Sequence, residues 1–197
     1  PRRRRAVRRS RVIRFTDNHG DQCSGALHYA VCSFGLDSTD VTLPDTPLLA
    51  RQLIQFMRST IPLAKAMDLQ LGGCDADSLT EFAPLQPNIN DKGCAFGGSL
   101  VSVMTLSGWA LVELALRQRG DDCDVFVGES TVRYLSPVWA DFTSVARLPV
   151  DVSWTSFFRS LDSRGKARIE VSCVIPGDNG KPAATLIARF VAQRRDA

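Results

Sequence analysis

Histidine is almost absent from this chain of 197 residues, which contains only His19 and His28. A Ser-His-Asp triad or a Cys-His dyad within residues 46–197 is therefore excluded, because both use a histidine as the base. A metal site with histidine ligands is excluded there for the same reason. The chain also lacks a Walker loop and a G-x-G-x-x-G motif, two common phosphate-binding fingerprints. We expect no metal and no cofactor.

No CxxC pair occurs among the six cysteines, which argues against a zinc site. An apolar signal segment is missing as well, and this argues against a disulfide framework in a chain of this size. We therefore expect reduced thiols in a cytoplasmic protein. A membrane helix needs roughly 18 uncharged apolar residues. Residues 97–116 come closest, but Gly, Ser, Thr and Glu113 interrupt them.

Positive charge is concentrated at one end of the chain, since residues 1–14 contain eight arginines and no acidic residue. Residues 46–197 contain 16 basic and 16 acidic side chains, so nucleic acid and membrane are not expected as partners. Three interpretations of residues 1–45 stay open: a disordered arm or start-site artefact, an arm that binds nucleic acid or a membrane surface, and an organelle transit peptide. We divide the chain into this extension and one domain, residues 46–197.

The hydrophobic pattern of this domain predicts two helices and a series of strands. Apolar residues at helical spacing predict a helix from about 48 to 61, kinked or ended by Pro62. Two short strands around a Gly-Gly/Asp turn are expected within 67–84, and a long helix over 97–119 that ends at Gly120. Five further strands are expected at 125–135, 142–148, 154–162, 167–175 and 182–193.

The long helix is apolar on nearly every side, with Glu113 as the only charge over residues 99–116. Such a helix must be buried, and the economical arrangement is a sheet wrapped around it. The small residues Gly98, Ser102 and Thr105 share one face. This face suits close packing against a strand, or the thin wall of a ligand tunnel, and both interpretations stay open.

The junction before this helix, residues 88–99, carries the most chemical information in the sequence. Gly97 and Gly98 have no Cβ atoms, so their backbone N–H groups can approach a ligand oxygen. The N-terminus of a helix adds about half a positive charge. Together they suit a carbonyl oxygen that becomes an oxyanion during acyl transfer. Simple close packing is the alternative explanation of the glycine pair.

Residues 88–109, NINDKGCAFGGSLVSVMTLSGW, resemble the core motif of hot-dog thioesterases, N-x-x-G-x-x-H-G-G followed by a long helix. More closely, the chain resembles the thioesterase family named for the C-terminal domain of YiiD, over most of residues 48–193. The resemblance implies an α+β single-domain hot-dog fold, a curved antiparallel sheet around one long central helix. It also implies a homodimer or a dimer of dimers. The site would lie at the dimer interface, with the acyl chain beside the helix.

Within this resemblance, Asn90 matches the loop asparagine of the motif, and Phe96 replaces the histidine before Gly-Gly. Thr105 stands where many relatives carry the acid that activates water, and it would hold water without deprotonating it. The substrate-binding residues expected from the motif and its surroundings are Asn88, Phe96, Ser99, Arg133 and Tyr134. Arg133 is a solvated or phosphate-contacting charge, and Tyr134 is a core or interface aromatic residue.

The general base is the open question, because no carboxylate occupies the expected helix position. Glu129 is one candidate, since neighbours such as Val127 and Thr131 on its strand face suggest burial and a raised pKa. Asn90 either orients the water or caps the loop. Asp91 and Cys94 are weaker candidates, because a loop aspartate is usually solvated and no histidine activates the thiol. The expected catalytic set is Asn90, Gly97, Gly98, Thr105 and Glu129.

We therefore expect an acyl-CoA or acyl-carrier-protein thioesterase that releases a free acid. The replaced histidine and the missing carboxylate favour an alternative, a hot-dog protein that binds acyl thioesters without turnover. A hot-dog dehydratase or hydratase is a weaker possibility, because such enzymes generally pair a histidine with an acid.

Overall fold

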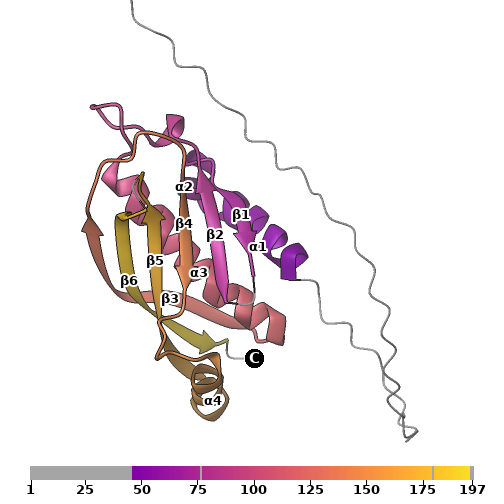
Figure 1. The fold of residues 1–197 in the computed structure, drawn as a ribbon. Coiled ribbons are helices and arrows are strands. Elements are labelled where there is room, and N and C mark those ends of the chain that lie inside the picture. Colours follow the sequence, from indigo (N-terminus) through magenta and orange to yellow (C-terminus); the bar gives the residue numbers. More distant parts are fainter. Residues whose placement is uncertain (1–45, 76, 179, 196–197) are drawn as a thin grey trace, which may run out of the picture. The chain divides into compact units, whose positions relative to one another are not determined.

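The computed structural model describes residues 46–75, 77–178 and 180–195. Six strands form one antiparallel sheet in the order β1-β2-β4-β5-β6-β3, and α3 lies behind it in Figure 1. This confirms the α+β hot-dog architecture. The strands are β1 (Gln70–Cys74), β2 (Ser78–Ala83), β3 (Cys123–Tyr134), β4 (Phe142–Arg147), β5 (Lys166–Pro176) and β6 (Pro182–Arg194). The interpretation of residues 1–45 falls outside the described residues.

The first helix, α1 (Thr46–Thr60), turns the apolar residues Ala50, Leu53, Ile54 and Met57 into the core. It packs beside β1 and against α3 (Figure 1). Pro62 ends the predicted helix but then begins another one, α2 (Pro62–Ala66). Proline is compatible with the first turn of a helix, where its missing N–H would have no partner.

The strand pair β1–β2 is where the sequence prediction placed the turn incorrectly. Gly72 and Gly73 lie inside β1, which ends at Cys74, and the antiparallel strand β2 begins at Ser78. The register of β1 against β2 shifts between Leu71 and Gly73. This irregularity explains the glycines, because a bulge tolerates residues that weaken a regular strand.

The central helix α3 (Gly97–Arg119) fills the concave side of the sheet and ends at Gly120, whose φ is 73°. Gly108 marks its closest approach to the sheet: a Cβ built there would lie 2.9 Å from the ring of Phe190 and 3.2 Å from Cys173 Sγ. The helix is long and apolar enough to span a membrane, a test that a buried core helix also passes. Here its buried side chains, such as Leu100, Met104 and Leu111, belong to the hydrophobic core.

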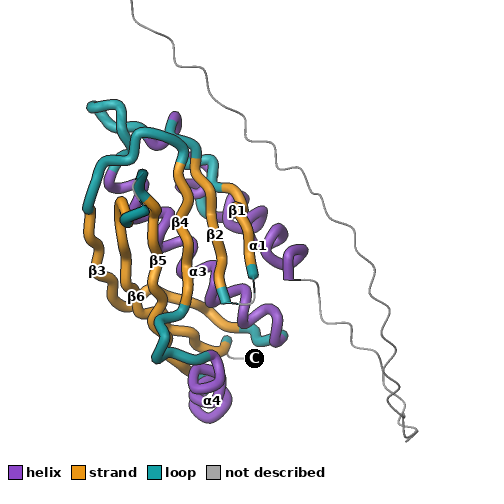
Figure 2. Tube along the Cα trace, in the orientation of Figure 1, coloured by secondary structure: helices purple, strands orange, loops and turns teal. Residues whose placement is uncertain are grey.

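The predicted strand over 154–162 is wrong, because these residues form α4 (Trp154–Arg164) (Figure 2). Ser153 caps the helix by accepting a hydrogen bond from the Ser156 N–H at 3.3 Å. Phe157 and Leu161 are its buried residues, four positions apart on one face. The local sequence therefore had a helical period and a capping residue, and the run of aromatic residues obscured both.

Candidate active site

The loop that precedes α3 is held in place by Asn88, which is 1% exposed. Its Nδ2 donates hydrogen bonds to the carbonyl oxygens of Met67 at 2.9 Å and Pro84 at 2.8 Å. The backbone carbonyl oxygen of Asn88 accepts the Phe96 N–H at 2.7 Å. Asn88 thus fixes the start of α3 from inside the protein, and this burial does not support the expected contact with substrate.

The side chain of Asn90 organises the next turn. Its Oδ1 accepts the Lys92 N–H at 2.8 Å and the Cys94 N–H at 3.3 Å, and its Nδ2 contacts Cys94 Sγ at 3.2 Å. Gly93, with φ of 85°, allows the chain to reverse here. Of the two roles considered for Asn90, these contacts support capping of the loop. Cys94 is 7% exposed and is occupied by the same contacts.

The first turn of α3 presents backbone N–H groups that no side chain caps. Gly97 lies against the strand end, where Tyr134 Oη donates a hydrogen bond to its carbonyl oxygen at 3.2 Å. The ring of Phe96 covers Gly98, since a Cβ built on Gly98 would overlap it. Phe96 is 56% exposed. A ligand that approaches these N–H groups would therefore have to displace this ring.

A half-buried stripe continues along α3 from this turn through Gly98, Ser102, Thr105, Trp109 and Glu113. These positions follow one another at intervals of three or four residues, so they share a helix face.

The hydroxyl groups of α3 differ in their hydrogen bonds. Ser102 Oγ donates to the Gly98 carbonyl oxygen at 2.8 Å, while Ser107 Oγ lies 2.6 Å from Ser144 Oγ in the core. Neither Thr105 nor Ser99 has a side-chain hydrogen bond to any other described residue. Both are half-buried, so their hydroxyl groups are available to a ligand or to water.

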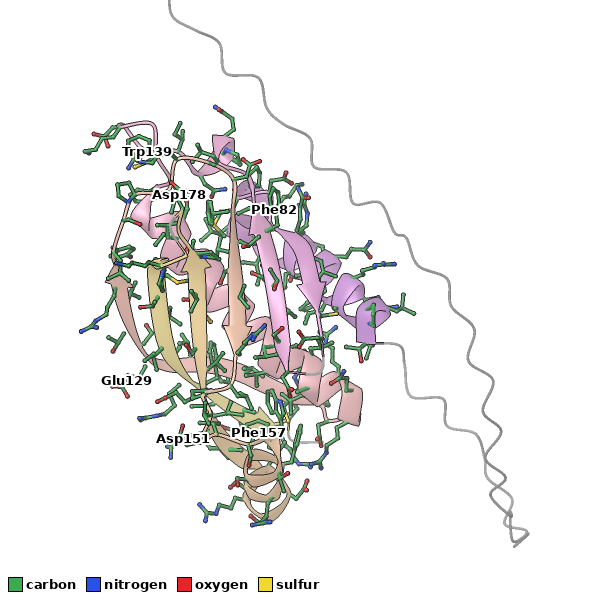
Figure 3. All side chains as sticks on the ribbon, viewed as in Figure 1. Phe82, Glu129, Trp139, Asp151, Phe157 and Asp178 are labelled. Atoms are coloured by element: carbon green, nitrogen blue, oxygen red, sulfur yellow. The ribbon has the colours of Figure 1, made fainter. Side chains whose placement is uncertain are left out.

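The burial expected for Glu129 is wrong. Its side chain is 67% exposed and its Oε2 lies 3.1 Å from Arg189 Nη1. Figure 3 shows Glu129 at the outer margin of the sheet. The reason is a bulge at Gly128, where the pairing of β3 with β6 shifts between Val127 and Glu129. Val127 therefore faces α3, while Glu129 and Thr131 face the opposite side of the sheet.

The neighbouring candidates Arg133 and Tyr134 lie near the end of β3, which is an edge strand. Arg133 faces away from α3, as its register partner Thr185 does. Tyr134 faces the same side as its partner Ala184, toward α3, yet is 55% exposed. An exposed aromatic ring beside the first turn of α3 fits the expected interface role of Tyr134.

The sequence interpretation missed Glu81, a fully buried carboxyl group on β2. Neither of its oxygen atoms has a hydrogen-bond partner in the described part of the chain. Burial raises the pKa of Glu81 well above its usual value, which favours the neutral acid. The alternation Leu79, Glu81, Ala83 was the available signal, because it places all three on the inner face.

Glu81 belongs to a small polar cluster between the sheet and α3. Its register partner on β4 is Ser144, which contacts Ser107 on the helix. Cys173 on β5 completes the cluster, and burial raises the pKa of its thiol to about 12. Three strands separate β2 from the edge strand β3. The cluster is therefore remote from Tyr134 and the first turn of α3.

A pocket of about 560 Å³ opens at the other end of α3, beside the same edge strand. Its apolar wall and one of its four carboxylates come from α1, α3 and β3: Leu49, Phe56, Trp109, Glu113, Val125 and Phe126. Glu113 Oε1 lies 2.8 Å from Arg117 Nε, and its side chain is 14% exposed. Oε2 of Glu113 has no partner among the residues described.

The sequence profile of one protein family matches residues 50–194, the putative thioesterase family of the YiiD C-terminal domain. Among solved structures, the chain is similar to a putative thioesterase from Shewanella oneidensis, with 30% identity and a TM-score of 0.67 over 75% of this chain and 99% of that one. A protein of unknown function from Chlorobaculum tepidum shares 28% identity, with a TM-score of 0.72 over 76% of this chain and 97% of that one.

A third structure supports the fold alone. It is a probable thioesterase from Pseudomonas aeruginosa, with 22% identity and a TM-score of 0.62 over 78% of this chain and 99% of the other. The matched segment begins within α1 and ends with β6, so it includes the first turn of α3 and the edge strand.

Proposed function

Because the chain belongs to the putative thioesterase family of the YiiD C-terminal domain, we propose that it hydrolyses acyl thioesters of CoA or of acyl carrier protein and releases the free acid. The observation that carries this proposal is the uncapped first turn of α3, which begins with Gly97 and Gly98. A cytoplasmic location remains part of the proposal.

In the proposed reaction, the thioester carbonyl oxygen accepts hydrogen bonds from the N–H groups of Gly97 and Gly98. These donors and the helix dipole stabilise the negative charge that develops on this oxygen. Thr105, whose hydroxyl has no hydrogen-bond partner among the described residues, lies about 10 Å along α3 from Gly98, so it would hold the attacking water for a thioester bound by the other copy of a dimer. Phe96 swings away when substrate binds, and its exposure permits this movement.

We also propose that the protein is a dimer formed through β3. One edge of this 12-residue strand pairs with β6, and the other edge has no strand beside it in the described sheet. An unpaired edge is a template for a further strand. The exposed side chains of Phe126 and Val127 support association at this edge.

The alternation of side chains along β3 supports antiparallel pairing of two copies about the Gly128–Glu129 bond. In that register, each side chain that faces α3 in one copy lies opposite a side chain that faces α3 in the second copy. The bulge makes this possible, because it gives the two halves of β3 the same alternation of inner and outer side chains about the Gly128–Glu129 bond. The inner pairs are Cys123 with Tyr134, Val125 with Val132 and Val127 with Ser130.

The outer face gives charge complementarity in the same register. Asp124 of one copy lies opposite Arg133 of the other, and the two-fold axis repeats the pair. Opposite charges directly across two strands stabilise their pairing. Shifting one β3 strand by two residues along the other keeps the same faces together, but leaves residues at the strand ends unpaired.

A non-catalytic acyl-thioester-binding protein is the second candidate. One observation favours it: within a single described copy, the stripe on α3 has no carboxylate between Gly98 and Thr105, and Glu113 lies two turns further along the helix. The full chain is incubated with a series of acyl-CoAs of different chain length. Thiol release measures hydrolysis and calorimetry measures binding, and together they distinguish the thioesterase from the non-catalytic binding protein. Thiol release supports the thioesterase, and binding without release supports the alternative.

The division of the chain at residue 46 is a further part of the proposal. A protein that consists of residues 46–197 should be soluble and as active as the full chain, because α1 begins the packed core. Loss of solubility or of activity on truncation would show that residues 1–45 contribute to the folded domain.

A further inference from the structure

We infer that the protein acts on thioesters of CoA, whose adenine nucleotide binds in a pocket beside Trp139, with Asp178 and Lys181 as its polar contacts. This inference rests on the proposed thioesterase function and chooses between its two substrate classes. It begins from a pocket that the reaction itself does not use, at the end of the sheet where α3 begins.

This second pocket, called the nucleotide pocket below, has a volume of about 560 Å³, within the range of sites for small molecules. The loop between β3 and β4 forms one side, and the turn between β5 and β6 forms the other. Figure 3 shows Trp139 and Asp178 at one end of the sheet and Asp151 at the other. The lining residues are Leu135, Ser136, Pro137, Trp139, Gly177, Asp178, Lys181 and Pro182.

Trp139 presents an aromatic surface to the nucleotide pocket. It is 58% exposed, although tryptophan is a residue that proteins usually bury for the most part. Leu135, which is 56% exposed, adds a further apolar surface to the same pocket. Because every nucleobase has a flat π face, stacking on an aromatic side chain stabilises its binding. The pocket therefore suits a flat aromatic ring, such as the adenine of CoA.

Two charged side chains at the turn between β5 and β6 match the polar parts of an adenine nucleotide. Asp178 and Lys181 both line the pocket, and neither forms an ion pair with any described residue. A carboxylate accepts a hydrogen bond from the exocyclic amine of adenine, and an ammonium group binds phosphate as a point charge. One carboxylate and one ammonium group beside an exposed indole thus favour an adenine nucleotide over an uncharged aromatic ligand.

Glycines fix the shape of the turn that carries these two residues. The Gly177 N–H donates to the Lys181 carbonyl oxygen at 2.8 Å. A Cβ built on Gly177 would lie 2.8 Å from the same oxygen, so a larger residue would push the turn apart. Gly180 has a φ of 69°, which other residues rarely adopt. The backbone therefore keeps Asp178 and Lys181 beside the pocket.

The nucleotide pocket is joined to the turn that would hold the thioester. The Val138 carbonyl oxygen accepts the Ala95 N–H at 2.8 Å, so Trp139 directly follows a residue bonded to the segment that leads into α3. Ala95 precedes Gly98 by three residues, which limits the distance between their Cα atoms to about 11 Å. The pantetheine arm of CoA can therefore run from a thioester at Gly98 to a nucleotide beside Trp139.

The same pocket distinguishes CoA from acyl carrier protein. A carrier protein presents its thioester on a phosphopantetheine arm that carries no adenine, so Trp139 and Asp178 would have no ligand. Thioesters of CoA are therefore the substrates that use the whole surface. A lower KM for octanoyl-carrier protein than for octanoyl-CoA would contradict this choice.

The first test measures nucleotide binding without turnover. ADP is the probe, because it carries the adenine and the diphosphate of CoA, and calorimetry on the full chain measures its dissociation constant. Trp139→Leu should weaken ADP binding by about tenfold or more, while Trp139→Phe, which keeps an aromatic ring, should restore most of it. A Trp139→Leu protein that binds ADP as wild type does, or wild type that binds pyrophosphate as tightly as ADP, would overturn the inference.

The second test examines the contact of Asp178 with the base. Inosine diphosphate has an oxygen where ADP has the exocyclic amine, so wild type should bind ADP about tenfold more tightly. Asp178→Ala should bind the two nucleotides equally. Any effect of this substitution on the turn itself changes both affinities together and leaves their ratio unchanged. A preference for ADP that Asp178→Ala retains would contradict the contact.

The third test compares substrates with and without the nucleotide. Lys181→Gln should raise KM for octanoyl-CoA by about tenfold, the effect of losing a charged hydrogen bond. Its kcat should change little, and its KM for octanoyl-pantetheine should match that of wild type. Lys166→Gln, at the opposite end of β5, is the control. Equal KM values of the two variants for octanoyl-CoA would overturn the role of Lys181.

Nucleotide binding separates failure of the proposed function from failure of this inference. If wild type binds ADP but hydrolyses neither octanoyl-CoA nor octanoyl-pantetheine, the thioesterase proposal fails and the nucleotide pocket is supported. If wild type hydrolyses both substrates with the same KM and does not bind ADP, the thioesterase is supported and the inference is overturned.

Discussion

The hydroxyl of Tyr134 lies 3.2 Å from the carbonyl oxygen of Gly97, so the end of edge strand β3 is tied to the first turn of α3. This hydrogen bond therefore links the strand through which two copies would pair to the turn that would hold the thioester. Changes at either element should affect both association and turnover.

Gly98→Ala keeps the backbone N–H but adds a Cβ that would block the approach of the thioester oxygen, so kcat should fall by about 100- to 1000-fold, the usual effect of losing an oxyanion donor. The added Cβ would meet the Phe96 ring, which is exposed and can rotate, so the melting temperature should change by only a few degrees. Thiol release and thermal unfolding measure the two effects. Gly73→Ala is the control, because a Cβ there meets no atom within 4 Å. Equal rates for both variants would remove Gly98 from the site.

Thr105→Val keeps the shape of the side chain and removes the hydroxyl. If the hydroxyl holds the water, Thr105→Val should lower kcat about as much as Thr105→Ala does, by roughly tenfold, the cost of one hydrogen bond. Steady-state kinetics on both variants decide the point. A valine variant that retains the wild-type kcat, beside a weaker alanine variant, would mean that Thr105 only packs.

Glu81 should make the protein less stable as pH rises. Its folded pKa lies above the usual 4.5, so between these two values the native state binds more protons than the unfolded state. Its contribution is complete below about pH 4.5 and falls by about 1.4 kcal/mol per pH unit above it, until the folded pKa is reached. Glu81→Leu should abolish this decline in urea unfolding, whereas Glu170→Gln should preserve it. Parallel curves for wild type and Glu81→Leu would contradict the assignment.

Reversal of charge at the edge strand tests the dimer. Arg133→Asp places like charges opposite Asp124 twice per dimer, and should raise the dimer dissociation constant by about tenfold. Asp124→Arg combined with Arg133→Asp should restore most of the affinity. Sedimentation velocity measures all three proteins. If the double variant is no tighter than Arg133→Asp, the proposed register is incorrect.

The sequence predicted the fold well where one periodic pattern dominated. The apolar helix over Gly97–Arg119 and four of the five later strands followed from such patterns. The segment at Trp154 failed because its aromatic residues suit both a strand and a helix. The Ser153 cap and packing against β5 favour the helix over a strand. The packing is a tertiary contact, so the local sequence could not show it.

The site was less predictable, because its residues depend on register and burial. A single extra residue at Gly128 reversed the face of Glu129, and no alternation rule can locate such a bulge in advance. Asn88 and Asn90 were identified as important, but the hydrogen bonds show that they shape the loop. Glu113 was noticed as the only charge over residues 99–116, and its place in the pocket beside Trp109 depends on how α3 packs against α1 and β3.

Chemical labelling of Cys173 would report how often α3 separates from the sheet. The thiol is fully buried between the sheet and α3, and its pKa of about 12 leaves almost no reactive thiolate at neutral pH. Alkylating reagents can therefore modify it only while the helix is detached from the sheet. The labelling rate of this cysteine, followed by peptide mass spectrometry, would measure how often the central layer opens, and substrate analogues that clamp α3 should slow it.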